Sequence, residues 1–395
     1  MSFSISWTDV PESADSEPVS SHFTLSDYPE KSVLVKSGAE HLFVSGDNYP
    51  VLKFLLPEYK EKVDFIYIDP PYNTGKKSFA YNDSFEVDAW LSFMKRRLML
   101  ARSFLCPDGC IFIAIGQDEL YRLKLLCDSI FGEENFINDF MWLHGKGKKD
   151  TFSRTMQQST LCYAKDRKKL RSFEDYEVTG WAEKNADGDP RGNWFSGSIS
   201  FSEERSSPSH PNFFQIVSPS GIKWKRQWLV TREEMQNLIE DNRIYWGSAP
   251  DFANVPREKI FNGQRNKIIP KNIVDNSETT RAAQNHLDSL LGEKNSFDNP
   301  KPVSLIEHFL KIAQVRKEAV IMDFFAGSGT TFEAVVRMNE EDGGKRRCLL
   351  VQKPENILRR GSVYSTISEL CYARIKKVIP PEDGITFKEC RERQN

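Results

Sequence analysis

Short apolar runs that alternate with amphipathic stretches constrain the fold of this chain more than any other feature. The run VDFIYI at 63–68 is apolar almost throughout, as expected for a strand that is covered on both faces. Similar runs recur on both sides of a long central region. Strands are expected at 41–48, 63–68, 110–116, 320–325 and 347–351, and helices at 49–56, 87–105, 118–131, 302–313 and 330–338. The pattern predicts an α/β fold with a doubly wound, mostly parallel sheet.

The alternation stops over residues 166–296, which are rich in Ser, Pro, Asn, Gly and aromatic residues. We expect this segment to form an inserted module with many turns and one helix near 231–242. It separates two halves of the sheet domain, at 40–165 and 297–379. The ends are expected to lie outside the sheet, with residues 1–39 as an acidic arm, flexible over 1–30, and residues 380–395 as a polar tail.

The composition argues against several classes of protein. No run reaches the roughly 18 to 20 apolar residues that a membrane span needs, and the acidic, polar start is unlike a signal peptide. The seven cysteines are scattered without a CxxC pair, which favours reduced thiols over disulfides or a zinc site. We therefore expect a cytoplasmic protein that uses neither a metal nor a membrane. Residues 1–47 sum to −6, so the net charge of −2 leaves +4 on the remainder, which is compatible with phosphate contacts.

A first polar constellation, Asp69-Pro70-Pro71-Tyr72, follows the strand expected at 63–68. Ligands of open α/β sheets bind outside the carboxyl ends of strands, where this motif lies. Its residue types suit methyl transfer to an exocyclic amine, whose lone pair is delocalised into the ring. Asp69 and the Pro70 carbonyl would accept the two N–H groups and direct the lone pair at an electrophile, while Tyr72 offers a face for stacking. The plainer alternative is a strand end with a proline turn and a capping aspartate.

A second constellation, D-F-F-A-G-S-G-T-T at 323–331, lies at another strand end and opens a helix. Gly327 and Gly329 allow a tight turn and a close approach to a ligand, and the helix amides that follow can bind an anionic group such as a carboxylate. Phe325 can pack on an adenine ring or near a sulfonium cation. The third glycine of a dinucleotide fingerprint and the Gly-Lys-Ser/Thr of a phosphate loop are both absent. A third segment, F-D-N-P-K-P at 297–302, reads on its own as a proline-rich helix start.

The order of these motifs resembles that of the β class of amino-methyltransferases that act on DNA. D-P-P-Y-N-T-G at 69–75 comes first, N-P-K-P at 299–302 follows after a long insert, and F-A-G-S-G-T-T at 325–331 comes last. Methyltransferases that modify protein glutamine or ribosomal guanine share a similar first motif but usually place the cofactor loop before it. The sequences D-P-P-Y-N-T-G and L-L-V-Q, at 69–75 and 349–352, are most similar to those found in modification subunits of type III restriction systems.

The resemblance implies an S-adenosyl-L-methionine-dependent DNA methyltransferase that modifies adenine N6 in restriction-modification. The residues that it implies as catalytic are Asp69, Pro70, Pro71 and Tyr72. Those implied for the cofactor pocket are Asp323, Phe325, Gly327 and Gly329, bordered by Lys301 and Pro302. The insert at 166–296 would recognise the target in double-stranded DNA, and a homodimer or a separate restriction subunit are further partners that the resemblance admits. All these roles require residue 69 and the turn at 327–329 to border one cavity.

Several alternatives stay open at the level of the sequence. Cytosine N4 chemistry uses the same geometry as adenine N6 chemistry, whereas no cysteine follows a proline at a strand end, which argues against carbon-5 cytosine chemistry. RNA or protein is an alternative substrate, and a DNA-recognition subunit without catalysis is an alternative of a different class. Gln352 stands where many methyltransferases carry the acidic residue that holds the cofactor ribose, with Glu355 a little later. The residue that binds the ribose is therefore left open, and G-D-N at 46–48 resembles a family segment beside the active site.

Overall fold

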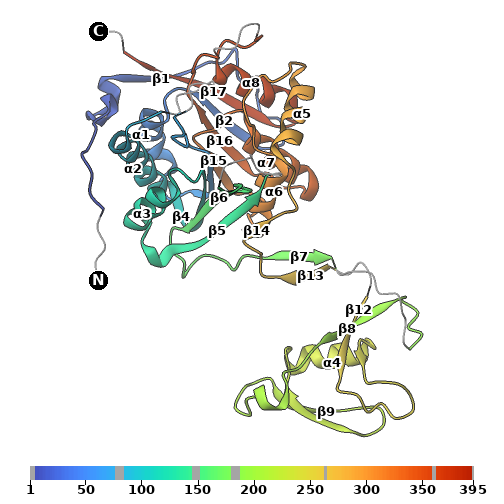
Figure 1. The fold of residues 1–395 in the computed structure, drawn as a ribbon. Coiled ribbons are helices and arrows are strands. Elements are labelled where there is room, and N and C mark those ends of the chain that lie inside the picture. The colour runs from blue at the N-terminus through green and yellow to red at the C-terminus, as the bar shows by residue number, and fades with distance from the viewer. Residues whose placement is uncertain are drawn as a thin grey trace. The chain divides into compact units, whose positions relative to one another are not determined.

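The computed structural model of the chain describes residues 5–75, 84–144, 152–178, 187–261, 265–357 and 362–393. It divides into two compact units (Figure 1), of which one comprises Met1–Glu174 with Pro270–Asn395 and the other comprises Asp175–Ile269. We call them the sheet unit and the insert unit. The insert unit is shorter at both ends than the module expected at 166–296, because residues 270–296 contribute a strand and a helix to the sheet unit.

Ten strands form the central sheet of the sheet unit. They are β1 (Phe23–Asp27), β2 (Glu40–Ser45), β3 (Val63–Ile68), β4 (Leu105–Ile115), β5 (Phe136–Leu143), β6 (Gln157–Ala164), β14 (Ile273–Val274), β15 (Val320–Asp323), β16 (Arg347–Gln352) and β17 (Gly384–Glu392). Their order across the sheet is β1-β17-β2-β16-β15-β3-β4-β6-β5-β14. The strands from β17 to β4 are parallel to one another, whereas β1 and β6 run antiparallel to their neighbours.

Helices cover both faces of this sheet (Figure 1). One face packs against α1 (Asn48–Tyr59), α2 (Val87–Phe104) and α3 (Leu120–Phe131). The other packs against α6 (Val303–Ile312), α7 (Thr330–Asp342) and α8 (Ile367–Val378), and α5 (Thr280–Leu291) contacts α8. Successive side chains of β3 enter opposite cores, Ile66 and Ile68 on the first face and Phe65 and Tyr67 on the second. The predicted α/β fold with a doubly wound, mostly parallel sheet is thereby confirmed.

The direction of winding reverses between β3 and β15, which are adjacent in the sheet. From β3 the chain moves to β4 on one side, and from β15 it moves to β16 on the other. The connections therefore diverge above the carboxyl ends of β3 and β15 and leave a crevice there, as is usual at a topological switch point. Asp69 directly follows β3 and Asp323 ends β15, so both constellations lie at this crevice.

The two ends of the chain differ from what their composition suggested. Residues 384–392, expected within a polar tail, form β17 in the interior of the sheet, where Ile385 and Phe387 are buried in the core beside α8. The expected acidic arm at 1–39 contains two 3-10 turns, Ser13–Asp15 and Val19–Ser21, and the strand β1, which pairs with β17. The described part of the arm is held against α2 because Arg96 pairs with Asp9 and Asp15 and Arg97 pairs with Glu12.

The insert unit has a small core of its own. It contains paired strands β7 (Asp175–Val178) and β13 (Arg265–Ile268), a three-stranded sheet of β8 (Trp194–Ser198), β11 (Ile244–Tyr245) and β12 (Arg257–Phe261), and a ribbon of β9 (Phe213–Val217) and β10 (Lys223–Gln227). Helix α4 (Arg232–Glu240), expected near 231–242, begins with a capping box between Thr231 and Glu234. Trp228, Met235 and Trp246 are buried in the core of this unit.

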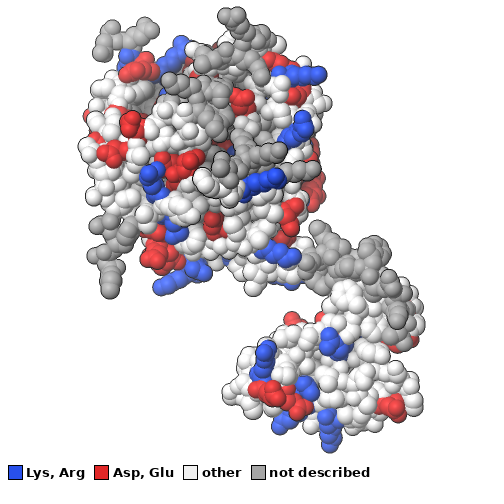
Figure 2. All heavy atoms as spheres, in the orientation of Figure 1, with Lys and Arg blue, Asp and Glu red and all other residues white. Residues whose placement is uncertain are grey.

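Two further observations concern the surface. Among the described helices, none is long and apolar enough to cross a membrane. In the view of Figure 2, lysine and arginine side chains are interspersed with aspartate and glutamate on both units, and neither sign of charge dominates.

Candidate active site

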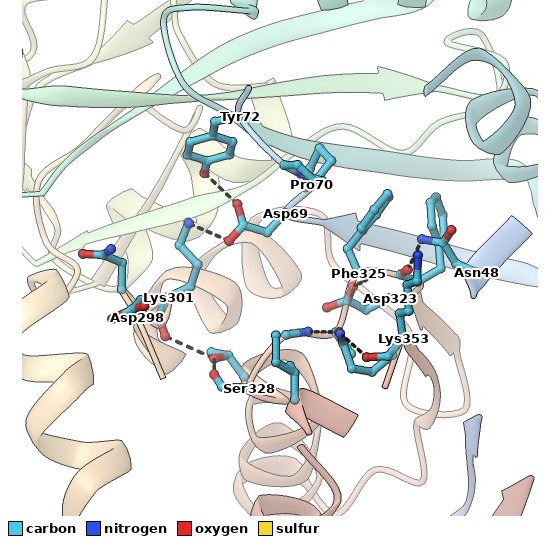
Figure 3. A pocket seen from close by; sticks show the side chains of 18 of the residues that line it. Asn48, Asp69, Pro70, Tyr72, Asp298, Lys301, Asp323, Phe325, Ser328 and Lys353 are labelled. Atoms are coloured by element: carbon cyan, nitrogen blue, oxygen red, sulfur yellow. Dashed lines mark hydrogen bonds and ion pairs between the residues drawn. The ribbon is translucent and has the colours of Figure 1, made fainter. Parts of the chain in front are cut away.

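The carboxylate of Asp69 is held by hydrogen bonds on both of its oxygens (Figure 3). Tyr72 Oη donates to Asp69 Oδ1 at 2.6 Å, and Lys301 Nζ donates to Asp69 Oδ2 at 2.6 Å. Pairing of β3 ends at Ile68 because neither Pro70 nor Pro71 has an N–H to donate. The chain therefore turns out of the sheet with the carboxylate directed into the crevice.

Asn73 fixes the turn that follows this motif. Its backbone is left-handed, with φ of 55°, a conformation that asparagine tolerates better than most residues. Its side chain donates to Glu119 Oε1 at 2.8 Å and accepts from the backbone N–H of Phe85 at 2.7 Å. In addition, Trp90 Nε1 donates to the Pro71 carbonyl oxygen at 2.9 Å. The start of α2 and the buried Glu119 thus hold the 69–73 segment in place.

A glycine turn connects β15 to α7. Gly327 and Gly329 have φ of +54° and +82°, angles that residues other than glycine rarely adopt. A Cβ at position 327 would lie 3.4 Å from Phe297 Cζ, and one at position 329 would lie 3.2 Å from Cys371 Sγ. The N–H of Gly327 donates to Gln352 Oε1 at 2.7 Å. Gln352, considered for the cofactor ribose from the sequence, therefore also supports the turn.

Asp323 is a buried carboxylate at the base of this turn, with 3% of its surface exposed. Thr331 Oγ1 donates to one oxygen at 2.6 Å, and the N–H of Phe325 donates to the other at 2.9 Å. Burial raises the pKa of Asp323 to about 7, although these two hydrogen bonds oppose the rise. The group therefore changes charge near neutral pH.

Arg374, which sequence analysis did not single out, clamps the same turn from α8. Its side chain is 1% exposed and donates to Ser328 Oγ at 3.1 Å and to Thr330 Oγ1 at 2.9 Å. It also pairs with Glu333 at 2.9 Å. Burial favours a higher pKa for Glu333, but Arg374 and the basic side chains of His286 and Arg337 hold that pKa below its usual value. A buried ion pair thus anchors the hydroxyl groups on which the glycine turn rests.

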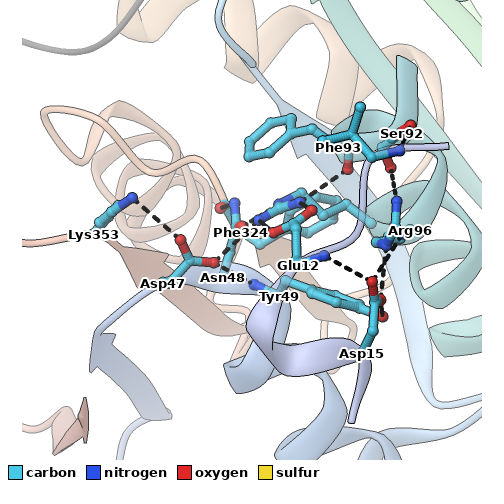
Figure 4. Close-up of polar contacts among 12 residues, drawn as sticks. Glu12, Asp15, Asp47, Asn48, Tyr49, Ser92, Phe93, Arg96, Phe324 and Lys353 are labelled. Atoms are coloured by element: carbon cyan, nitrogen blue, oxygen red, sulfur yellow. Dashed lines mark hydrogen bonds and ion pairs between the residues drawn. The ribbon is translucent and has the colours of Figure 1, made fainter. Parts of the chain in front are cut away.

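The N-terminal segment supplies a further part of the site that was not predicted (Figure 4). Arg97 of α2 is fully buried, and its guanidinium binds both oxygens of Glu12 at 2.8 and 2.9 Å and Asp47 at 3.1 Å. It also lies 3.5 Å from the ring centre of Phe93 and contacts Asn48, whose side chain donates to the Phe324 carbonyl oxygen at 2.7 Å. Residues 46–48 are therefore linked to Glu12 through Arg97. They are also linked to Phe324 through Asn48.

One cavity of about 920 Å³ joins these groups, and all its lining residues belong to the sheet unit. Asp69 and Gly327 both line it, so the expectation that they border a shared cavity is confirmed. Of the residues implied as catalytic or cofactor-binding, those that line it are Asp69, Pro70, Pro71, Tyr72, Lys301, Asp323, Phe325 and Gly327. Gly329 and Pro302 lie just outside its lining, at the first positions before α7 and α6.

Glu12, Asp47, Phe93, Lys353 and Glu355 also line the cavity. Lys353 forms an ion pair with Asp47 at 3.3 Å, and the rings of Phe93 and Phe325 lie 5.9 Å apart. Arg97 and Lys353 outweigh the effect of burial and hold the pKa of Asp47 below its usual value. Among the described residues, no group of three or more His, Cys, Asp or Glu is placed to hold a metal ion. The lining of the cavity thus includes the aromatic rings of Phe93 and Phe325 and charged side chains such as Asp47 and Lys353.

A mostly parallel doubly wound sheet with D-P-P-Y at one strand end and a glycine turn at the adjacent one is the arrangement expected of an amino-methyltransferase. Residues 63–360, well over half of the chain, match the DNA methylase family. The chain belongs to this family, which confirms the family predicted from the order of the motifs.

Three relatives illustrate the similarity. The chain is 32% identical to the type III restriction-modification enzyme StyLTI Mod subunit of Salmonella typhimurium, over 89% of this chain and 59% of the relative. It is 32% identical to the EcoPI Mod subunit of Escherichia phage P1, over 86% of this chain and 62% of the relative. The type II methyltransferase M.KpnI of Klebsiella pneumoniae is 28% identical over 84% of this chain and 86% of its own length. The chain thus spans about 60% of the type III subunits that it matches.

Proposed function

We propose that this chain transfers a methyl group from S-adenosyl-L-methionine to the N6 amine of adenine in duplex DNA. The observation that carries the proposal is the single cavity bordered by Asp69 and by the glycine turn at Gly327. A carboxylate suited to an amine and a turn suited to an anionic ligand are far apart in the sequence but share one crevice in the fold. The topology brings the two strand ends together, but a capping aspartate would accept from the backbone that follows it, whereas both oxygens of Asp69 accept from the side chains of Tyr72 and Lys301.

The cofactor fits the half of the cavity around the glycine turn. A Cβ at position 327 would narrow the cradle beside Phe297, and the buried Asp323 offers a carboxylate to a cationic amino group. The amides at the start of α7 suit a carboxylate, and the rings of Phe93 and Phe325 suit an adenine ring. Asp47, Lys353 and Glu355 are polar groups of the same wall that suit ribose hydroxyls. When bound, the cofactor supplies the methyl group on a sulfonium sulfur.

The chemical step assigned to this chain's residues concerns the amine. The target base leaves the duplex at a cost of a few kcal/mol and stacks on Tyr72. Asp69 accepts one N–H and the Pro70 carbonyl accepts the other, so that the nitrogen becomes pyramidal and its lone pair points at the methyl carbon. The nitrogen–carbon bond forms as the carbon–sulfur bond breaks. The surplus proton then leaves the nitrogen for Asp69 or for water.

Methyl transfer with the Asp69→Asn variant tests this proposal. Wild-type protein, duplex DNA and methyl-labelled cofactor should give labelled DNA, and the variant should lose at least about 10²-fold in rate, as expected when a transition-state contact is removed. Asp64→Asn is the matched control, because Asp64 lies near the other end of β3 and, like Asp69, pairs with a cation, here Arg316. Equal rates for Asp69→Asn and the wild type would refute the mechanism. Nucleoside analysis of the product separates N6-methyladenine from N4-methylcytosine, the alternative target.

Recognition of DNA by the insert unit is part of the same proposal. A two-stranded ribbon such as β9–β10 can enter a major groove. On its outward face Lys223 and Lys225 are exposed, and the side chain of neither forms an ion pair or hydrogen bond with the described residues. Its other face is packed, since Phe214 and Ile216 belong to the core of the unit. Helix α4 is less suited to DNA because its exposed side carries Glu233, Glu234 and Glu240.

Replacement of both Lys223 and Lys225 by alanine tests the role of the ribbon. If both bind phosphates, the slope of log affinity against log salt should fall by roughly 2, about 1 for each lost contact. Arg232→Ala, which removes an exposed cation from α4, should leave the slope unchanged. A slope that is the same in the double variant and the wild type would exclude the ribbon as the phosphate-binding surface.

The relatives named as type III Mod subunits support a place in restriction-modification for this chain. We propose that it works in the cytoplasm with a separate restriction subunit, and that it forms a homodimer, as its resemblance to the β class implies. Sedimentation of the purified protein tests the dimer, and co-purification from the source cells tests the restriction subunit.

A further inference from the structure

The side chain of Lys301 contacts the D-P-P-Y motif and not the glycine turn. Its ammonium lies 2.6 Å from Asp69 Oδ2 and 5.2 Å from the ring centre of Tyr72. The Lys301 side chain is 10% exposed and that of Asp69 is 28% exposed, so the pair is largely shielded from water. The second carboxylate oxygen is bound by Tyr72 Oη. Lys301 and Tyr72 therefore restrain the carboxylate from two sides (Figure 3).

The backbone of Lys301 is tied to the cofactor half of the cavity. Thr330 Oγ1, at the first residue of α7, donates to the Lys301 carbonyl oxygen at 3.2 Å. The same hydroxyl accepts from Arg374 at 2.9 Å. On either side of Lys301 the chain is stiff, because Pro300 and Pro302 have fixed φ angles. Lys301 thus joins the helix that follows the glycine turn, through its main chain, to Asp69, through its side chain.

We propose that Lys301 is a positioning residue for Asp69, an inference that rests on the proposed function and reassigns a residue first placed at the border of the cofactor pocket. An ionised carboxylate has about four lone-pair directions. The ammonium and the phenol use one direction on each oxygen and leave others for an amine N–H. With the carboxylate fixed before the base arrives, the amine meets an acceptor that is already oriented. Misplacement of a catalytic group by about 1 Å costs up to about 10²-fold in rate.

The Lys301→Met variant tests this role, because methionine keeps much of the side-chain length and removes the charge. We expect the single-turnover methyl-transfer rate at saturating cofactor to fall about 10- to 100-fold. The dissociation constants for S-adenosylhomocysteine and for duplex DNA should stay within about threefold of the wild type, which also shows that the variant is folded. Lys301→Arg should recover most of the lost rate, since arginine restores a cation beside the carboxylate.

Lys124→Met is the matched control. Lys124 pairs with Asp128 at 2.8 Å, and Tyr163 Oη donates to Asp128 Oδ1 at 2.7 Å, so the same three residue types meet outside the cavity lining. This variant should transfer methyl groups and bind S-adenosylhomocysteine as the wild type does.

Two results would overturn the inference about Lys301. In the first, Lys301→Met weakens S-adenosylhomocysteine binding and transfers at the normal rate at saturation, which would return Lys301 to the cofactor pocket. In the second, the variant matches the wild type in both measurements. Either result leaves the proposed function standing as long as the wild type methylates DNA. A wild-type protein that methylates no duplex DNA would instead remove the proposed function itself.

Discussion

Replacing Arg374 by methionine should weaken cofactor binding, although the Arg374 side chain does not line the cavity. The effect is expected to act through the glycine turn. The buried guanidinium donates to Ser328 Oγ and Thr330 Oγ1, and hydrogen bonds that involve a charged group contribute about 1.5 to 3 kcal/mol each. Its third partner, Glu333, keeps Arg337 at 2.5 Å and His286 at 2.7 Å on Oε1, whereas Oε2 loses its bonds to Arg374 and the variant is also destabilised there. The two bonds to the glycine turn alone amount to about 3 kcal/mol, the lower end of their sum.

The consequence is measured by isothermal titration with S-adenosylhomocysteine. Because about 1.4 kcal/mol corresponds to a tenfold change, a loss of about 3 kcal/mol that appears fully in binding should raise the dissociation constant of Arg374→Met roughly 100-fold. Arg337→Met is the control, since Arg337 binds the same Glu333 but is 40% exposed and does not contact the turn. Its affinity should stay within about twofold of the wild type, as for most exposed pairs. Wild-type affinity in Arg374→Met, or equal weakening in both variants, would refute the reasoning.

Three further predictions concern the same cavity. Burial raises the pKa of Asp323 to about 7, and only its ionised form attracts a cationic amino group, so S-adenosylhomocysteine affinity measured by titration should fall roughly tenfold between pH 8 and pH 6. Asp323→Asn should bind weakly at both pH values, and an unchanged pH dependence in that variant would exclude Asp323 as the source. Arg97→Met should lower the free energy of unfolding in urea by about 3 kcal/mol, because it leaves Glu12 without its bidentate partner, and a loss below about 1 kcal/mol would contradict this. Gly327→Ala should strain the backbone by about 1 to 2 kcal/mol and weaken cofactor binding about tenfold or more, whereas Gly292→Ala, which has a similar φ and open space around it, should leave the binding unchanged.

The sequence predicted the interior of the sheet well because a strand buried on both faces has a simple signature. The run at 63–68 has that signature, and β3 occupies the same residues. The missed strand β17 is different, since polar residues such as Lys388 and Glu389 interrupt its buried ones without a regular alternation. It is buried because β1 and β2 cover its two edges, and a pairing between strands so far apart in the sequence is not visible in a local pattern.

The site was predictable in its strand-end motifs and not in its supports. Asp69 and Gly327 follow strands at a switch point, and topology alone brings such positions together. Arg97 and Arg374 lie in amphipathic helices, where a charged residue usually faces water. Each is buried here because its partners, such as Glu12 and Glu333, come from other segments. A local helical period carries no information about partners that arrive from elsewhere in the chain.

The central place of β17 has a consequence for how the protein is made. Among the described strands, β1 comes first along the chain and pairs with β17 alone, whereas β17 comes last and also pairs with β2. Until residues 384–392 leave the ribosome, two strands present open edges that invite pairing with other chains. Translation that stalls, or proteolysis that clips the chain, ahead of residue 384 would leave those edges bare. The sheet is therefore continuous from β1 to β2 only after β17 has been made.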